Sequence, residues 1–259
     1  MKLLFIGDIV GRPGRQAVRD LLPALRREYD DPLVVANAEN ASGGRGLTKE
    51  NAAELYDAGV HFITMGNHVW DNRQILDFID DDPRLIRPAN YPAGAPGRGT
   101  GVVTRQGRKV GILNLSGRVF MAPLDNPFAL AGQLAAGLRR ETPLVIMDFH
   151  AEATSEKQAM GWFMDGKVSA VLGTHTHVQT ADARILPKGA AYITDVGMTG
   201  PADSVLGVKK EIIINSFLSQ MPARFDVAGG ETRQFNAVLL TLDEQTGKAA
   251  EIETIQRLL

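Results

Sequence analysis

Metal-capable and proton-transferring side chains recur in this sequence directly after short apolar runs. Four of the five histidines, with several acids and amides, stand at such places. Each apolar run is typical of a buried strand, and the loops at the carboxyl ends of parallel strands meet along one rim. We therefore expect one site to gather Asp8, Glu39, Asn67, His68, His150, His175 and His177.

The residue types in this set favour a catalytic metal site. Imidazole and carboxylate ligands without thiolate suit Fe, Mn or Zn in a catalytic role rather than structural zinc. The chain has no cysteine, which excludes disulfides, Cys-ligated zinc and thiol catalysis. Glu39 could bridge two cations, and two cations about 3.5–4 Å apart can bind a hydroxide and clamp a phosphate for in-line attack. His68 is then the candidate general acid, because its neighbour Asn67 would be occupied as a ligand.

Taken alone, most of these residues have an ordinary structural explanation. Asp8 could cap a turn, and Glu39 lies in a loop of common composition. His150 could be a buried structural histidine. The element His175-Thr176-His177 is stronger, because a spacing of two at a strand end can aim both rings into one loop. The joint occurrence of these elements at strand ends is what favours a metal centre.

The elements that must position these residues alternate in the first third of the chain as strand, polar loop and helix. Pro23 lies inside the first expected helix and is expected to kink or split it, and residues 11–14 are expected to form a loop. The expected helices cover 15–29, 48–58, 71–79 and 128–139. The expected strands cover 3–6, 33–36, 61–65, 101–104, 109–115, 144–149, 168–172 and 190–194, with a C-terminal hairpin of 235–242 and 249–255.

Composition limits the classes of protein and partner. With 259 residues and 44% hydrophobic content the chain can bury a sizeable core, and we expect a single domain over residues 1–259. The formal charge of -2 argues against wrapping long nucleic acid, although a nucleotide or a short RNA end remains open. No apolar stretch could span a bilayer and no signal peptide is evident, so a cytoplasmic protein without membrane contact is expected. A homo-oligomer is the usual expectation for such an enzyme.

A group of motifs resembles those of the calcineurin-like metallophosphoesterases. These motifs are Gly7-Asp8, Gly66-Asn67-His68, His150 and Gly173-Thr174-His175-Thr176-His177. The Gly-Asn-His and Gly-x-His-x-His elements are specific in combination. The resemblance implies an α/β fold in which two mixed β-sheets pack face to face with flanking helices, a four-layer metallophosphoesterase-like sandwich.

Two departures from the usual family pattern point to one branch. The usual Asp-x-His motif is here Asp8-Ile9-Val10, and Asn37-Ala38-Glu39-Asn40 replaces the usual Gly-Asp element. Both changes resemble the bacterial YmdB-type branch, over nearly the whole chain. This resemblance implies that Glu39 bridges two metals and that Asn40 replaces the missing histidine. One metal would then take Asp8, Glu39, Asn40 and His177, and the other Glu39, Asn67, His150 and His175.

The same resemblance implies an activity. Members of the branch are phosphodiesterases on cyclic nucleotides, including 2′,3′-cyclic forms, and 3′,5′-cyclic nucleotides are a further possible substrate. We expect a metal-dependent phosphoric diester hydrolase with two Fe ions, or Mn as the alternative. A metal-bridging hydroxide would attack phosphorus while His68 protonates the departing ribose oxygen. Two alternatives stay open, a phosphomonoesterase and a metal-binding regulatory protein that senses a nucleotide with little turnover.

Other polar residues near these motifs have less specific predictions. Arg12 and Arg15 could meet a phosphate, but solvation is the simpler expectation. Asp148 shares a strand face with His150 and could either orient a ligand or be structural. Asp71 could tune His68, although a helix cap is the simpler expectation. His61, which begins a strand away from the pattern, is expected to be structural.

Overall fold

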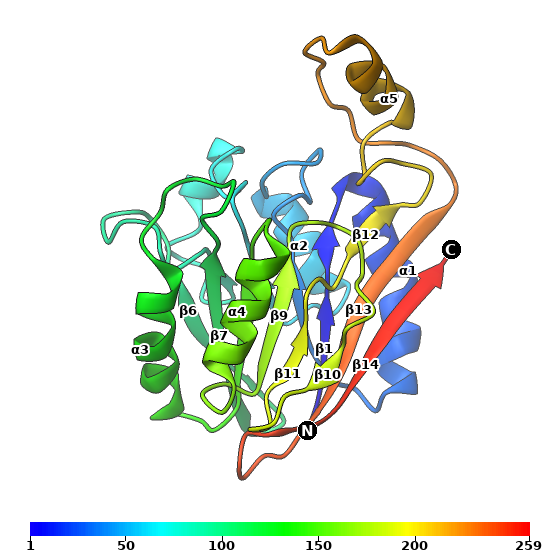
Figure 1. The fold of residues 1–259 in the computed structure, drawn as a ribbon. Helices are drawn as coiled ribbons and strands as arrows, with labels where there is room; N and C mark the ends of the chain where they lie inside the picture. The colour runs from blue at the N-terminus through cyan, green and yellow to red at the C-terminus, as the bar shows by residue number, and fades with distance from the viewer.

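The computed structural model describes residues 1–259 as two packed β-sheets with helices on both outer faces (Figure 1). The first sheet has the order β2-β12-β13-β1-β3-β4-β5, with β14 paired to β13, and the second has the order β10-β11-β9-β8-β7-β6. The first sheet comprises β1 (Lys2–Ile6), β2 (Asp8–Ile9), β3 (Leu33–Asn37), β4 (Phe62–Thr64), β5 (Leu85–Ile86), β12 (Met198–Pro201), β13 (Arg233–Leu242) and β14 (Ala249–Leu258). The second comprises β6 (Thr100–Arg105), β7 (Arg108–Ser116), β8 (Val145–His150), β9 (Ala170–Thr174), β10 (Arg184–Ile185) and β11 (Ala191–Ile193).

Four of the helices complete the outer layers. Helices α1 (Gly11–Glu28) and α2 (Lys49–Asp57) cover the first sheet, and α3 (Pro127–Arg139) and α4 (Thr154–Met164) cover the second. Strand β1 shows why the chain layers in this way. Its alternate residues Leu3 and Phe5 enter the core between the sheets, whereas Leu4 and Ile6 pack under the helices of the first sheet. The predicted fold class, two mixed sheets face to face with flanking helices, is confirmed.

Parallel pairing brings the carboxyl ends of the central strands to one edge of the molecule. Strands β1, β3, β4 and β5 pair in parallel in one sheet, and β7, β8 and β9 do so in the other. The arrows of β1 and β9 point to the upper edge of Figure 1. The polar loops that follow these strands therefore share this edge.

Two predicted helices differ from those observed. Helix α1 begins at Gly11, so the expected loop at residues 11–14 is its first turn, where Pro13 is tolerated because no N–H is required. Pro23 neither splits nor ends this helix. The segment expected to be helical at 71–79 contains a short 3-10 helix, η1 (Arg73–Asp77), whose N-cap is Asn72.

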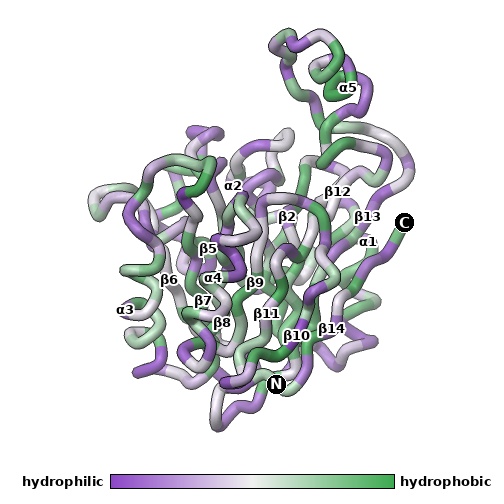
Figure 2. The backbone as a smooth tube through the Cα atoms, in the orientation of Figure 1, coloured by the Kyte–Doolittle hydropathy of each residue, from purple (hydrophilic) through white to green (hydrophobic).

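A fifth helix, α5 (Lys210–Ser219), was not predicted and lies outside the four layers. It projects beyond the upper edge of the sheets, and Figure 2 shows hydrophobic residues along it. None of its residues is buried, so no core-facing stripe marks it in the sequence. No helix in the structure combines the length and the apolar character needed to cross a membrane.

Candidate metal centre

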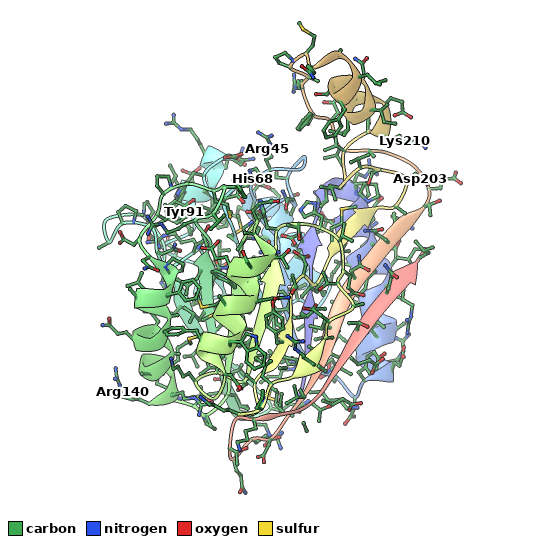
Figure 3. All side chains as sticks on the ribbon, in the orientation of Figure 1. Arg45, His68, Tyr91, Arg140, Asp203 and Lys210 are labelled. Atoms are coloured by element: carbon green, nitrogen blue, oxygen red, sulfur yellow. The ribbon has the colours of Figure 1, made fainter.

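The carboxyl ends of five strands, β1, β3 and β4 of the first sheet and β8 and β9 of the second, deliver the predicted site residues to one place. Asp8 lies in β2, and His150 is the last residue of β8. Glu39 and Asn40 follow β3, Asn67 and His68 follow β4, and His175 and His177 follow β9. Figure 3 places His68 at the upper edge, at the opposite end of the molecule from Arg140.

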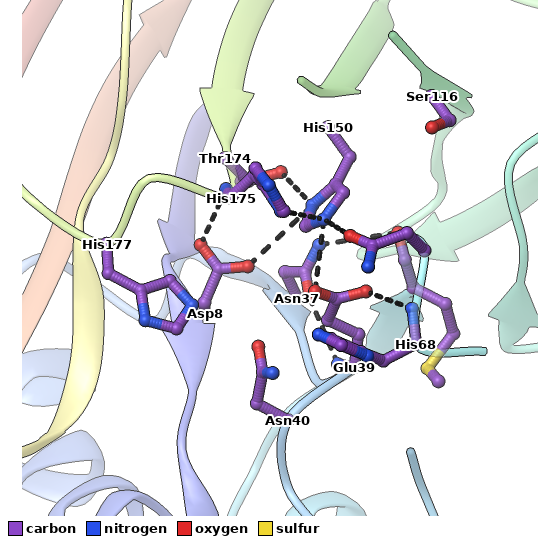
Figure 4. Close-up of polar contacts among 12 residues, drawn as sticks. Asp8, Asn37, Glu39, Asn40, His68, Ser116, His150, Thr174, His175 and His177 are labelled. Atoms are coloured by element: carbon purple, nitrogen blue, oxygen red, sulfur yellow. Dashed lines mark hydrogen bonds and ion pairs between the residues drawn. The ribbon is translucent and has the colours of Figure 1, made fainter. Parts of the chain in front are cut away.

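His150 lies at the centre of the cluster (Figure 4). Its Nε2 is 3.0 Å from Glu39 Oε1, 2.9 Å from Asn67 Oδ1 and 3.0 Å from His175 Nδ1. Ligand atoms of Glu39, His150 and His175 all lie within 4.8 Å of one another. Four groups from four different segments thus present lone-pair atoms to one small volume, as metal ligands do.

Three buried oxygens of this cluster have no hydrogen-bond partner in the protein. They are Asp8 Oδ1, Glu39 Oε1 and Asn40 Oδ1. Asn40 donates from Nδ2 to the carbonyl of Gly44 at 2.8 Å, which fixes the amide by its nitrogen and leaves the oxygen free. Buried oxygens without a donor are costly unless a cation neutralises them. The residues therefore fit the metal ions that the sequence motifs imply.

Gly66 leaves the space that the ligands occupy. A Cβ at this position would lie 2.4 Å from both Glu39 Oε2 and His150 Nε2. No side chain can be accommodated there without displacing Glu39 and His150, two of the predicted ligands. The Gly-Asn-His motif thus requires glycine here, because Glu39 and His150 approach the backbone of Gly66 too closely for a side chain.

A short hydrogen-bond relay orients His150. Its Nδ1 is 2.9 Å from Thr174 Oγ1, and that hydroxyl donates to Asp148 Oδ1 at 2.7 Å. The Asp148 carboxylate also accepts from Thr64 and Asn37. With its proton on Nδ1, the imidazole presents the Nε2 lone pair to the other ligands. Asp148, for which the sequence left two roles open, therefore acts on the cluster through Thr174.

Burial and neighbouring charges both shift the pKa values of the predicted ligands, and they oppose each other at His150 and Glu39. Burial lowers the pKa of His150, but the charge of Glu39, followed by that of Asp8, outweighs it and raises that pKa above its ordinary value. Burial would raise the pKa of Glu39, but the charge of His150 lowers it below its usual range. Burial and then His150 lower the pKa of His175 to about 3. Glu39 and His150 thus form a buried ion pair, and a metal ion bound at these predicted ligands would displace the proton of His150.

The sequence profile of the family described as YmdB-like protein matches residues 4–255. The chain belongs to this family. It is 53% identical over 255 residues to the 2′,3′-cyclic-nucleotide 2′-phosphodiesterase of Bacillus subtilis, covering 98% of this chain and 96% of that protein. The crystal structure of a novel phosphatase from Mycoplasma pneumoniae has a TM-score of 0.93 at 39% identity, covering 100% of this chain and 93% of that chain.

A more distant structure shows the breadth of the fold. The NAD nucleotidase of Haemophilus influenzae has a TM-score of 0.63 at 15% identity, covering 100% of this chain and 56% of that chain. At this identity the likeness concerns the fold alone. The family match and the relative from Bacillus subtilis confirm the resemblance to the YmdB-type branch of the metallophosphoesterases that the motifs predicted.

In this YmdB-like protein, the residues flanking the ligands differ in part from expectation. Asp71 Oδ2 lies 2.9 Å from His68 Nδ1, while Asn72 caps the following helix, so the expected cap at Asp71 was wrong. Arg15 is not simply solvated, because it pairs with Glu54 at 2.6 Å and donates to the carbonyl of Ala41. Arg12 is exposed, as expected.

Sequence reasoning missed a buried ion pair that supports the histidine loop of the YmdB-like protein. Lys157, in α4, lies 2.7 Å from Asp195, and the two side chains are 1% and 0% exposed. The same Asp195 oxygen accepts from the backbone N–H of Thr176 at 3.0 Å and from its hydroxyl at 2.7 Å. Both neighbours of Thr176 have a positive φ, 99° at His175 and 65° at His177, which is unfavourable for any residue other than glycine. The ion pair therefore holds a strained loop that carries two predicted ligands, His175 and His177.

The fifth histidine, His61, is structural and leads to a stability prediction. Its Nδ1 accepts a hydrogen bond from the backbone N–H of Val34 at 2.9 Å. Burial, and then the charges of Arg105 and Arg26, lower its pKa to about 4. As pH falls, His61 is therefore protonated in the unfolded chain before it is protonated in the folded protein. The folding stability that neutral His61 contributes is lost between about pH 6.5 and pH 4.

The variant His61→Asn keeps an acceptor but does not titrate. Between pH 6.5 and pH 4 the wild type should lose about 1–2 kcal/mol more unfolding free energy than the variant, a figure reduced because the ring is partly exposed. Urea unfolding at several pH values measures the difference. Parallel pH profiles for the two proteins would contradict the prediction.

Proposed function

We propose that this enzyme hydrolyses cyclic nucleotide phosphodiesters, 2′,3′-cyclic forms first, at a dinuclear metal centre. The buried oxygens of Asp8, Glu39 and Asn40 carry the proposal, because they accept no hydrogen bond within the protein and bound cations would satisfy them. The relative from Bacillus subtilis, named as a 2′,3′-cyclic-nucleotide 2′-phosphodiesterase, supports the substrate class. The proposal also includes 3′,5′-cyclic nucleotides, as a second substrate class.

The ligands divide into two sets that share Glu39. One cation would be held by Asp8, Glu39, Asn40 and His177, and the other by Glu39, Asn67, His150 and His175. When bound, two such cations supply Lewis-acid charge that activates water and neutralises the phosphate in the transition state. Imidazole, carboxylate and amide oxygen ligands favour Fe, with Mn as the alternative.

His68 is proposed to protonate the leaving ribose oxygen. Its backbone N–H donates to Glu39 Oε2 at 2.9 Å, so the residue lies beside the carboxylate that would be shared by the two cations. Its side chain is 23% exposed and lines a cavity next to the centre. Because Asp71 pairs with Nδ1, Nε2 is the nitrogen available for proton transfer.

The decisive experiment compares a diester with a monoester. After reconstitution with Fe or Mn, bis-p-nitrophenyl phosphate should turn over faster than p-nitrophenyl phosphate, and chelation should abolish turnover. The related structure described as a phosphatase keeps a phosphomonoesterase as the second candidate, which faster monoester turnover would favour. Two bound metals without turnover of either compound would instead favour a nucleotide-sensing protein.

A further inference from the structure

An arm of residues 209–226, which includes α5, rises from the same edge of the molecule as the metal centre (Figure 1). The two ends of the arm meet, because the N–H of Lys209 donates to the carbonyl of Asp226 at 3.0 Å. Directly below, Val208 and Val227 form a β-bridge. The arm thus projects from a base in which residues 208–209 pair with residues 226–227. Figure 3 shows Lys210 at the start of the arm.

The base of the arm is joined to the metal centre. His177 Nδ1 is 3.0 Å from the carbonyl of Leu206, so a predicted ligand is oriented by the segment that leads into the arm. Val227, at the other side of the base, packs against the start of α1 and against the loop after β3 that carries Glu39 and Asn40. A Cβ at Gly11 would lie 2.9 Å, and a Cβ at Gly44 2.8 Å, from its methyl groups. These contacts fix the position of the base relative to the ligands.

A cavity of about 600 Å³ lies between the arm and the metal centre. Asn40, His68 and His177 line the side of the centre, and Arg224 and Phe225 line the side of the arm. Its volume is within the range of about 300–1,000 Å³ that is typical of small-molecule sites. A substrate with its phosphate at the ligands and its leaving oxygen at His68 must extend into this space.

The arm side of the cavity has the chemistry of a nucleobase site. Phe225 is 47% exposed, and a partly exposed aromatic ring offers a stacking face to any base. Arg224 adds a guanidinium group, which stacks on planar rings and binds phosphate oxygens. The other large apolar residues of the arm, including Phe217 at 81% exposed and Leu218 at 80%, do not line the cavity.

We propose that Phe225 and Arg224 form the nucleoside subsite of the enzyme, in which Phe225 stacks on the base of a bound cyclic nucleotide. This inference rests on the proposed function and adds the group that selects nucleotides over smaller cyclic diesters. Because stacking does not read base edges, the subsite accepts purines and pyrimidines.

The test compares 2′,3′-cyclic AMP with glycerol 1,2-cyclic phosphate, which has the same type of cyclic diester but no base. Phe225→Ala should raise the KM for 2′,3′-cyclic AMP about tenfold, with kcat unchanged, and should leave both constants for the glycerol diester unaltered. Phe225→Trp should restore the KM. Phe217 is a more exposed phenylalanine of the same arm, and Phe217→Ala is the matched control. It should leave KM and kcat unchanged for both substrates.

Equal effects of Phe225→Ala on both diesters, or no effect on either, would overturn the subsite, as would an equal effect of Phe217→Ala. If the wild type hydrolyses neither diester, the proposed function fails and the subsite is decided by binding. Calorimetric titration of the metal-loaded protein with 3′-AMP should then show about tenfold weaker binding to Phe225→Ala. Unchanged affinity for 3′-AMP would refute the subsite independently of turnover.

Discussion

The variant His68→Asn is expected to lower kcat for 2′,3′-cyclic AMP by about 10²- to 10⁴-fold while retaining its metal. The link from this residue to the predicted ligands is its backbone N–H, which donates to Glu39 and is kept in the variant. The lost side chain contacts Asp71, which is not a predicted ligand. Removal of the imidazole should therefore affect proton transfer rather than metal binding.

The leaving group provides a second measurement of the same role. A ribose oxygen must be protonated as it departs, whereas p-nitrophenolate leaves without a proton. The loss caused by His68→Asn should accordingly be much smaller for bis-p-nitrophenyl phosphate than for 2′,3′-cyclic AMP. Steady-state kinetics on both substrates, with metal content measured by mass spectrometry, tests this, and His61→Asn is the matched control.

Three outcomes would count against this role for His68. Loss of metal would show that the side chain supports the ligands. An equal loss of rate on both substrates would remove the general-acid assignment and leave a positioning role. Little loss on either substrate would show that His68 takes no part in the catalytic step.

Much of the fold could be predicted because the central strands are continuous apolar runs. Strand β1 is one example, since four of its five residues are buried and face two different cores. Helix α5 could not be predicted in this way, because it buries no residue and its sequence carries no core-facing stripe. The first residue of α1 could not be predicted, because its Gly and Pro residues are as common in loops as in a first helical turn.

The candidate ligands could be placed because each stands at a strand end, and parallel pairing brings such ends together. The groups that support them could not be placed. Lys157 and Asp195 are 38 residues apart, and Lys157 lies in a helix that was not predicted. The relay from His150 through Thr174 to Asp148 depends on register between β8 and β9, which pairs His150 with Thr174. Local patterns carry no information on such pairs.

The ion pair that sequence reasoning missed gives the second large prediction. Lys157→Met should lower the free energy of unfolding by about 3–5 kcal/mol, because it leaves the fully buried Asp195 charge without a partner. Methionine has a similar length, so packing of α4 against the second sheet should be little changed. Urea unfolding measures the loss, with the exposed Lys49→Met as the control.

The same variant should also weaken metal binding. Asp195 holds Thr176 between His175 and His177, and a carboxylate that has lost Lys157 would move, which would release that strained loop. Calorimetric titration with Mn²⁺, under conditions where the variant remains folded, should show about 10- to 100-fold lower affinity. Lower stability with unchanged Mn²⁺ affinity would restrict the ion pair to a structural role. Unchanged stability would mean that the ion pair contributes nothing to folding, and that the loop is held by its hydrogen bonds alone.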